Sequence, residues 1–486
     1  MGSNSKLKYA NACNKDRISA LPDEIICDIL STLSTKEAVR TSIISPRWRN
    51  VWAHVPTLDL CDKHYQREFN PVGFSEFVDR ALCIHSPFNN HEFRLSSAFA
   101  EFVDRALSIR GSSKIHRLRL CCSGVKNYTL IDAWIRTAIR LNVVELELVL
   151  YSFGRPFELA RNLFTCKTLV VLKLLLESNI TFTPTSDCFP SLKFFHAKVY
   201  DPDADSMEKL FSSCPALEEL IIGGDIVASK VLNFNIEAPE LNRLKIFLAE
   251  DDFWEGSESN IFFNVNAPNL EKFDLEADFV ANYILNANSL SEAKIDLEYV
   301  HTSGYIDYEL GCVDRLERLF AGLLNVKYLS LSAPLFGDPE CHTEDGFHLP
   351  ELNRLNHLEL LLFTCCNWKS LIDLLKISPH LEHLDVYNNK ECTLENYRDL
   401  LVCEWVPPEF VPICLLSHLK TIYLRGIQGR PDETEVTKYL LKHGEVLNKV
   451  TIYTCDFRVE DKVKLCQEIS MFSKGSTTCQ IEFLEK

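Results

Sequence analysis

Short runs of alternating apolar and polar residues return at a regular interval through the middle of the chain. Each run has apolar residues at its first, fourth and sixth positions, and such alternation predicts a short strand with one buried face. The step from Leu217 to Leu241 is 24 residues, and the step from Leu169 to Leu217 is twice as long. We predict helical or irregular returns between the strands. The best copies are Leu169…Leu172…Leu174, Leu217…Leu220…Ile222, Leu241…Leu244…Ile246, Leu270…Phe273…Leu275, Val326…Leu329…Leu331, Leu355…Leu358…Leu360 and Leu381…Leu384…Val386.

A period of roughly 20–29 residues with this spacing is the pattern of leucine-rich repeats, which stack into a curved solenoid. No unit buries its apolar face alone, so neighbouring units share one long core. The array is irregular, with longer gaps between Leu290 and Val326 and between Leu381 and Leu419. The Asn or Cys expected after each strand occurs only at Asn389 and Cys455. The number of repeats therefore stays open.

The amino-terminal segment has a helical period instead. Pro22 suits the first turn of a helix, and Asp23 and Glu24 place negative charge at the positive end of the helix dipole. The sequence from Ser34 to Glu37 has the spacing of a capping box and predicts a second helix. The first helix carries one apolar stripe of Ile25, Ile26, Ile29, Leu30 and Leu33. The second helix continues through Ala38, Val39, Ser42 and Ile43. A third helix begins with Ser45 as N-cap and Pro46 as first residue, and one of its faces is lined by Trp48, Val51 and Trp52.

These residues resemble the F-box of plant proteins, with matches over 16–26, 29–30, 33, 38–42 and 45–52. In that family the F-box docks onto a Skp-type adaptor, which joins the protein to a cullin–RING ubiquitin ligase. Pro46 departs from the family, which usually carries a basic residue there. We expect little effect on the fold and a small loss of surface charge. The resemblance implies that the adaptor-binding residues are Leu21, Pro22, Ile25, Ile29, Leu30, Leu33, Val39, Ser45 and Trp48.

The carboxyl-terminal segment begins with a proline-rich boundary at 405–412. Strands are predicted at 419–424, 450–453 and 480–484, and helices at 432–443 and 459–472. The segment resembles the FBD domain of plant F-box/leucine-rich-repeat proteins, and its strands should extend or cap the solenoid. The matching residues are Trp405, Pro407, Pro408, Cys414, Leu415, Leu419, Lys420, Thr421, Gly426, Asp432, Glu433, Glu435, Val436, Lys438, Tyr439, Leu440, Val446, Leu447, Thr451 and Ile452.

The fold expected from these features is α/β. A flexible amino-terminal tail (1–15) precedes a short three-helix F-box (16–60). An irregular leucine-rich-repeat solenoid, or horseshoe, spans 61–402, and a carboxyl-terminal α/β FBD unit (403–486) continues or caps it.

One repeat is nearly literal, because the sequence 74–82 returns at 99–107 with an offset of 25 residues. The alignment extends from Phe93-Arg94-Leu95 to Leu118-Arg119-Leu120. We interpret it as a tandem duplication of one unit, 74–98 and 99–123, which a solenoid absorbs by lengthening. A neutral insertion is favoured over a changed binding surface.

Charge and cysteine content narrow the class of protein. The chain has 51 Lys and Arg against 68 Asp and Glu, a net charge of −17, which argues against a nucleic-acid or membrane-surface partner. The 19 cysteines are scattered, and the first residues lack the apolar run of a signal peptide. No stretch is apolar enough to predict a membrane span. We expect reduced thiols and a location in the cytoplasm, the nucleus or both.

Sites for chemistry are not predicted. We find no phosphate-binding glycine loop, no zinc-protease motif and no nucleophile elbow, and we expect no cofactor, metal or catalytic residue. His380 and His383 are three apart, so on a strand they point to opposite faces. The pairs Cys121-Cys122 and Cys365-Cys366, and Cys341 beside His342, are explained more simply by core packing or free thiols.

The variable residues of the strands should line the concave side of the solenoid. Both signs of charge are mixed and aromatic residues are few, which favours a protein partner. Solvated repeats look the same, so substrate-binding residues stay unassigned. These residues are Glu145, Glu147, Lys173, His196, Glu219, Arg243, Lys245, Lys272, Asp274, Glu292, Lys294, Tyr328, His357, Glu359, His383 and Asp385. The acidic stretch 250–255 is predicted to be a loop, with Trp254 packed on the solenoid.

The expected function is that of a substrate-receptor subunit of a Skp–cullin–F-box ubiquitin ligase. The F-box would bind the adaptor and, through it, the cullin and RING subunits, while the repeats hold an unidentified protein substrate. The alternative is an interaction scaffold whose F-box recruits no cullin. A hydrolase on a repeat scaffold is a third reading, and it would need a cluster of reactive side chains.

Overall fold

The chain forms two compact units, Met1–Ser152 and Phe153–Lys486. The computed structural model describes residues 18, 20–62, 94–123, 128–151, 157–176, 180–181, 188–200, 210–211, 214–226, 231–250, 261–277, 279–297, 312–332, 348–363, 368–389, 405–454 and 459–485. The predicted tail 1–15, the acidic stretch 251–255 with Trp254, and the cysteines at 341, 365 and 366 lie outside the described residues.

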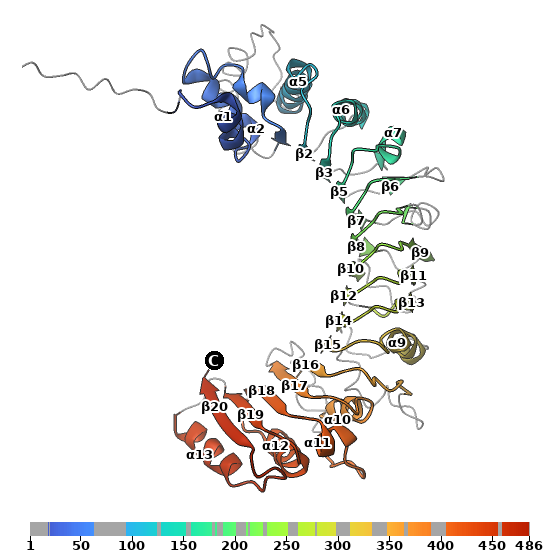
Figure 1. Ribbon diagram of the computed structural model, residues 1–486, viewed down its shortest axis with the longest axis vertical. Coiled ribbons are helices and arrows are strands. Elements are labelled where there is room, and N and C mark those ends of the chain that lie inside the picture. Colours follow the sequence, from blue (N-terminus) through green and yellow to red (C-terminus); the bar gives the residue numbers. More distant parts are fainter. Residues whose placement is uncertain are drawn as a thin grey trace, which may run out of the picture. The chain divides into compact units, whose positions relative to one another are not determined.

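The first unit is a short helical module followed by a parallel sheet in the order β1-β2-β3. Helices α5 and α6 connect successive strands (Figure 1). The elements are α1 (Asp23–Leu30), α2 (Thr35–Arg40), the 3-10 helices η1 (Thr41–Ile43) and η2 (Val51–His54), β1 (Thr57–Cys61), α5 (Arg94–Ile109), β2 (Arg117–Ser123), α6 (Tyr128–Arg140) and β3 (Glu145–Tyr151).

The predicted start of the third helix is wrong. Residues 46–50 form turns. In place of the predicted third helix, the structure has only the short 3-10 helix η2. Its backbone bonds join residues three apart, as from Ala53 N to Asn50 O (3.1 Å), and the turn before it is closed by a bond from Trp48 N to Ser45 O (3.1 Å). Such a short segment gains little from helix propensity, so burial of Trp48, Val51 and Trp52 decides its path.

The second helix begins where the capping box predicts, but only one of the two capping hydrogen bonds is formed. The Ser34 hydroxyl accepts a hydrogen bond from the Glu37 N–H at 3.3 Å. The Glu37 carboxylate instead accepts from Arg40 at 3.0 Å, so only one half of the box is formed. Ala38 and Val39 are buried, whereas Ile43, which was predicted to continue this helix, lies in the 3-10 helix η1 and is 72% exposed.

The second unit is built on a long parallel sheet in the order β5-β7-β8-β10-β12-β14-β15-β16-β17-β18-β19-β20. Each predicted apolar triplet places its second and third residues on a strand, facing the core. Leu220, Leu244 and Phe273 occupy matching register positions and are fully buried, which confirms the repeat architecture. The strands are β5 (Val171–Leu176), β7 (Phe194–Tyr200), β8 (Glu219–Ile226), β10 (Arg243–Glu250), β12 (Lys272–Ala277), β14 (Glu292–Leu297), β15 (Tyr328–Ser332), β16 (His357–Phe363), β17 (His383–Asn389), β18 (Thr421–Ile427), β19 (Lys449–Thr454) and β20 (Gln480–Glu485).

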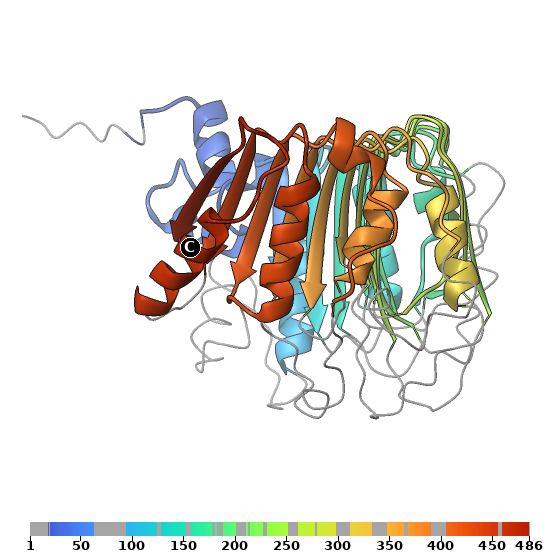
Figure 2. The ribbon, with the colours of Figure 1, turned by 90° about the horizontal axis from the view of Figure 1, so that it is seen from below.

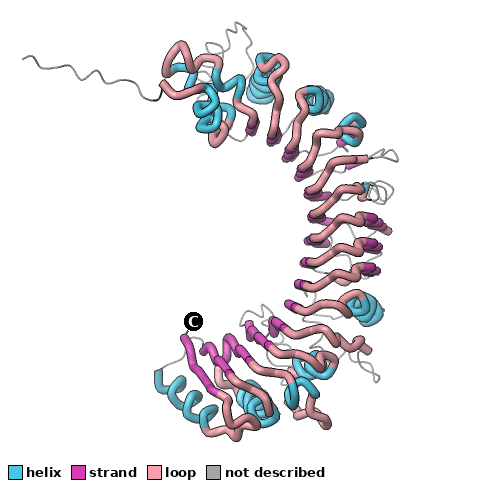
Figure 3. The backbone as a smooth tube through the Cα atoms, viewed as in Figure 1, coloured by secondary structure: helices cyan, strands magenta, loops and turns pink. Residues whose placement is uncertain are grey.

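The returns between these strands are of two kinds. Helices α7 (Arg161–Phe164), α9 (Cys312–Ala321) and α10 (Lys369–Lys376) occupy some of them, as predicted. In the middle, a second parallel sheet formed by β9 (Leu232–Glu237), β11 (Ile261–Asn266) and β13 (Asn282–Asn286) replaces the expected helical or irregular returns (Figure 3). The short strands β4 (Phe157–Glu158) and β6 (Ile180–Thr181) pair separately.

Aromatic rings fill the space between the two sheets. Phe234 stacks on Phe263 with ring centroids 4.6 Å apart, and Phe263 stacks on Tyr283 at 5.2 Å. The alternation of β9, with Leu232, Phe234 and Ile236 buried, brings one ring per repeat into this stack. Each returning strand therefore contributes to the shared core in place of a helix.

The carboxyl-terminal residues continue the same sheet. His383 to Tyr387 of β17 pair in parallel with Thr421 to Arg425 of β18, so the sheet crosses the predicted boundary at 402/403. Helices α11 (Ile413–Ser417), α12 (Pro431–His443) and α13 (Val459–Ser470) complete this part, and α12 covers the same face of the sheet as α10 (Figure 2). The Trp368 indole N–H donates to Asp432 at 3.1 Å, which ties the helix following β16 to the start of α12.

The literal repeat does not lengthen the sheet. Its second copy forms α5, in which Phe99, Phe102 and Val103 are buried. β1 pairs directly with β2, so no strand of the first copy lies between them. Arg94 and Leu95 belong to α5, whereas their aligned partners Arg119 and Leu120 belong to β2, so equal sequence does not give equal structure here. The part from 74 to 93 lies outside the described residues.

Candidate functional site

Helix α1 has two apolar faces. Ile26 and Leu30, four residues apart, are 0% and 1% exposed and point into the helical module. Ile25 and Ile29 form a second row on the neighbouring face, where they are 45% and 46% exposed. Leu33, just after the helix, extends this row at 41%. A soluble helix normally turns polar residues outward, so the second row is a surface suited to covering by a partner.

Hydrogen bonds hold this helix in place at both ends. Arg47 donates to the Leu21 carbonyl and to the Asp23 carboxylate (2.7 Å), which fixes the first turn. Beyond the last turn, the Thr57 hydroxyl donates to the Ser31 carbonyl at 3.1 Å. The backbone that carries Ile25, Ile29 and Leu33 is therefore hydrogen-bonded to the turn at 46–50 and to β1.

The structure divides the predicted adaptor-binding residues into two groups. Pro22, Ile25, Ile29 and Leu33 are exposed, and Leu21 is half-buried beside them. Ser45 is also half-buried, and its hydroxyl oxygen is shielded from solvent. Leu30, Val39 and Trp48 lie in the core at 1%, 2% and 3% exposure. In this conformation the side chains of these three residues are buried and are not available for contact.

Three further apolar side chains are exposed in the same module. Ile18 is 58% exposed, Ile43 72% and Ile44 61%. Sequence reasoning placed Ile43 on the second helix and identified none of these three residues as exposed. The available signal was the pair Ile43-Ile44 directly after the short α2, because adjacent side chains on a helix point about 100° apart and a short element cannot cover both.

The variable residues of the sheets engage one another in local networks. In the first unit, Arg119 lies between Glu147 (2.8 Å) and Asp59 (3.1 Å), and these two carboxylates raise its pKa. In the second unit, Arg425 donates to Asp385 at 2.9 Å and 3.0 Å. The guanidinium carbon of Arg425 lies 4.5 Å from the centroid of the Tyr453 ring and 4.9 Å from that of Tyr387. These charges are already compensated within the chain.

Histidines lie beside this arginine cluster. The His357 and His383 rings are 5.8 Å apart, and burial together with the neighbouring His383 lowers the pKa of His357. His383 Nδ1 bonds the Thr421 hydroxyl at 2.7 Å, while His380 Nδ1 lies 3.4 Å from His418 Nε2. His380 and His383 thus have separate partners and do not converge.

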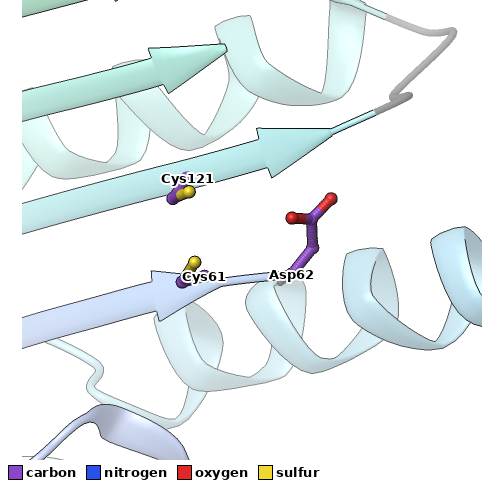
Figure 4. A group of neighbouring side chains, drawn as sticks. All are labelled: Cys61, Asp62 and Cys121. Carbon is purple, nitrogen blue, oxygen red and sulfur yellow. The ribbon is translucent and has the colours of Figure 1, made fainter. Parts of the chain in front are cut away.

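Among the described residues, one group of side chains has donor atoms close enough for a metal ion. The atoms of Cys61, Asp62 and Cys121 that would bind it lie within 4.8 Å of one another (Figure 4). All three residues are buried, and burial raises the pKa of the Cys121 thiol to about 12. A structural zinc site takes four protein ligands, and this group offers three among the described residues. We assign this group to packing between β1 and β2.

Comparison with known proteins identifies three regions of the chain. Residues 18–59 match the F-box domain, 131–294 match the leucine-rich repeats of FBD-associated F-box protein At5g56370, and 407–452 match the FBD domain. F-box/FBD/LRR-repeat protein At5g56420 of Arabidopsis thaliana is 30% identical over 481 residues, which cover 96% of this chain and 99% of the relative. F-box/FBD/LRR-repeat protein At3g52680 of the same plant is 31% identical over 501 residues, which cover 99% and 96%.

The chain belongs to the plant F-box/FBD/LRR-repeat family. The exposed row on α1 lies in its F-box, and an F-box implies a Skp-type adaptor as a partner. An F-box joined to leucine-rich repeats indicates a substrate receptor with no catalytic role of its own. In the part of the chain that the structure describes, no helix combines the length and apolarity needed to span a bilayer.

Proposed function

We propose that this F-box/FBD/LRR-repeat protein is a substrate-receptor subunit of a Skp–cullin–F-box ubiquitin ligase. The observation that carries the proposal is the exposed row Ile25, Ile29 and Leu33, while Leu30 and Trp48 of the same module are buried. Docking this row into an apolar groove of the adaptor removes it from water. The chain would then bring a bound protein close to the ubiquitin-conjugating enzyme, so that its contribution is proximity.

The partners follow from this role. The adaptor binds the F-box directly, the cullin and RING subunits bind through the adaptor, and the repeats hold the protein substrate. No cofactor takes part. We place this role in the cytoplasm, the nucleus or both.

A charge placed in the exposed row tests adaptor binding. In Ile29→Lys, the adaptor would have to bury an unpaired ammonium group, so we expect affinity for a purified plant Skp-type adaptor to fall at least about 100-fold. Isothermal titration of the full chain measures this. Ile109→Lys is the matched control, because Ile109 is also a helical isoleucine of the first unit and is 48% exposed.

Two results would contradict the assignment. Equal adaptor affinity for wild type and Ile29→Lys would mean that the row on α1 is not the docking surface. Absence of adaptor binding by the folded wild-type chain would favour the alternative, a scaffold that uses the repeats alone.

A further inference from the structure

Within the second unit, four neighbouring strands carry a concentration of positive charge. The residues concerned lie on the variable face of the sheet, which is the face opposite the buried leucines. Register pairing aligns Lys173 with His196, Ile221 and Lys245 across β5, β7, β8 and β10. The next row aligns Leu175, Lys198, Gly223 and Phe247, and the row before aligns Val171, Phe194, Glu219 and Arg243.

These three rows hold four cations and one carboxylate, in a chain whose net charge is −17. The carboxylate of Glu219 lies 3.9 Å from Arg243, and Lys245 is 4.0 Å from Glu276 on β12, the next strand. Both distances are at the outer limit for an ion pair, and the lysine and arginine side chains are 41% and 47% exposed. The local charge is therefore only partly compensated, and it attracts an anion.

Aromatic rings lie among these cations. The Lys173 ammonium is 5.6 Å from the centroid of the Phe194 ring, and the Lys245 ammonium is 5.8 Å from that of Phe247. Phe247 meets the His196 ring edge-on at 5.9 Å, although β8 runs between their two strands. The Phe247 ring can extend over β8 because position 223 is glycine. A Cβ at that position would lie 1.9 Å from the Phe247 ring.

The absence of a side chain at Gly223 lets Phe247 lie flat across β8. The result is a half-buried aromatic surface with cations on both sides, which we name the cationic shelf and define as Lys173, His196, Lys198, Arg243, Lys245 and Phe247. With strands about 4.8 Å apart, four strands span roughly 14 Å, the length of four or five residues of an extended peptide. Aromatic and arginine side chains are the usual anchors of protein interfaces.

We propose that the cationic shelf binds an acidic segment of the recruited protein, with carboxylates on its lysines and arginine and a bulky apolar side chain on Phe247. This inference rests on the proposed function, because it names the chemistry of the substrate that the receptor would hold. Nucleic acid fits less well, since the adjoining strand β12 presents Asp274 and Glu276.

Peptide binding to the full chain tests the proposal. The probe is a fluorescein-labelled peptide of twelve residues that contains Asp and Glu around one central Phe, and its partner has Lys in place of each acid. We expect fluorescence anisotropy to show binding of the acidic peptide only, weakened by added salt. The double variant Lys173→Gln with Lys245→Gln should reduce affinity about tenfold.

Lys294→Gln is the matched control, because Lys294 lies on the same row of the sheet but beside Asp274, and it should bind within twofold of wild type. Equal binding of both peptides, an unchanged affinity in the double variant, or tighter binding of a twelve-residue thymidine oligonucleotide would overturn the proposal. Adaptor affinity measured on the same preparations distinguishes failure of the ligase role from failure of the cationic shelf. If the chain does not bind the adaptor but still selects the acidic peptide, only the ligase role is contradicted.

Discussion

Tyr283 is a polar residue in an apolar position. Its ring completes the aromatic stack of the second unit and is 1% exposed. The hydroxyl has no hydrogen-bond partner among the described residues, and burial raises the pKa of the phenol well above its ordinary value. A buried hydroxyl without a partner costs free energy that a phenyl ring does not.

We therefore expect Tyr283→Phe to stabilise the second unit by about 1 kcal/mol, because the stacking stays and the desolvated hydroxyl is removed. Hydrogen exchange of the β13 amides measures the local free energy of opening. Tyr283→Leu is the comparison, and it should destabilise the unit because it removes the ring. Destabilisation by Tyr283→Phe would show that the hydroxyl has a partner.

Arg425 shows the opposite case of a charge satisfied within the fold. It combines two hydrogen bonds to Asp385 with packing against the Tyr387 and Tyr453 rings. Lysine cannot reproduce both the paired hydrogen bonds and the planar stacking. We expect Arg425→Lys to destabilise the second unit by about 1–2 kcal/mol in urea unfolding, whereas Lys420→Arg, in an exposed ion pair with Glu382, should have little effect. An equal effect of the two variants would contradict this account.

At the scale of elements, the start of α12 depends on one buried carboxylate. Glu433 is 1% exposed and accepts hydrogen bonds from Gln428 N (2.7 Å), Arg430 N (3.0 Å) and Asn388 Nδ2 (2.6 Å). Gly426 lies at the bulge near the end of β18 with φ +77°, and a Cβ there would lie 2.2 Å from the Asn388 carbonyl oxygen. Helix, turn and β17 are thus fixed to one another.

Removal of that carboxylate should be costly. We expect Glu433→Ala to destabilise the carboxyl-terminal strands by about 2–4 kcal/mol, because it leaves three donors without an acceptor. Glu435→Ala on the exposed side of α12, where the side chain pairs with Lys438, should change stability by less than about 0.5 kcal/mol. Thermal unfolding of both variants measures the difference, and similar melting temperatures would count against the capping role.

Elements were predictable from sequence where a local pattern and its burial agree. The triplet at Leu241, Leu244 and Ile246 located β10, and the helix predicted at 432–443 corresponds to α12. Predictions were wrong where packing outweighs local pattern. Trp48 and Trp52 pack into the core without an α-helix, and Arg94 joins a helix while its sequence duplicate Arg119 joins a strand.

The candidate site was predictable only in part, because sequence shows which residues are apolar and not which of them a fold leaves uncovered. Ile25 and Ile26 are adjacent and chemically identical, yet one is 45% exposed and the other is fully buried. The cationic shelf was not predicted. Its residues are spread over some 75 positions of sequence, from Lys173 to Phe247, and only the register of four strands brings them together.

At the scale of the whole molecule, the FBD and the last repeats form one continuous sheet. β17 and β18 pair along their length, and the Cys414 thiol donates to the Leu375 carbonyl at 3.4 Å across the same junction. A chain that ends at residue 402 would expose the edge of β17 and the apolar face beneath α12. The FBD therefore closes the core of the repeats.

We expect a chain truncated at residue 402 to lose cooperative unfolding and to be cleaved within β16 and β17 by limited proteolysis, where the full chain is resistant. The matched control is removal of residues 1–15, which precede the F-box. This deletion should leave the proteolytic fragment pattern of the second unit unchanged. Resistance of β16 and β17 in the 402 truncation would mean that the repeats end independently of the FBD.

The most direct test of the receptor role is cullin capture by the full chain in the presence of a purified plant Skp-type adaptor. We expect wild-type protein and Ile109→Lys to capture cullin only when the adaptor is present, and we expect Ile29→Lys to capture none while remaining folded. Cullin capture by Ile29→Lys at the wild-type level would contradict the receptor role. So would a wild-type chain that binds the adaptor but captures none of the cullin present.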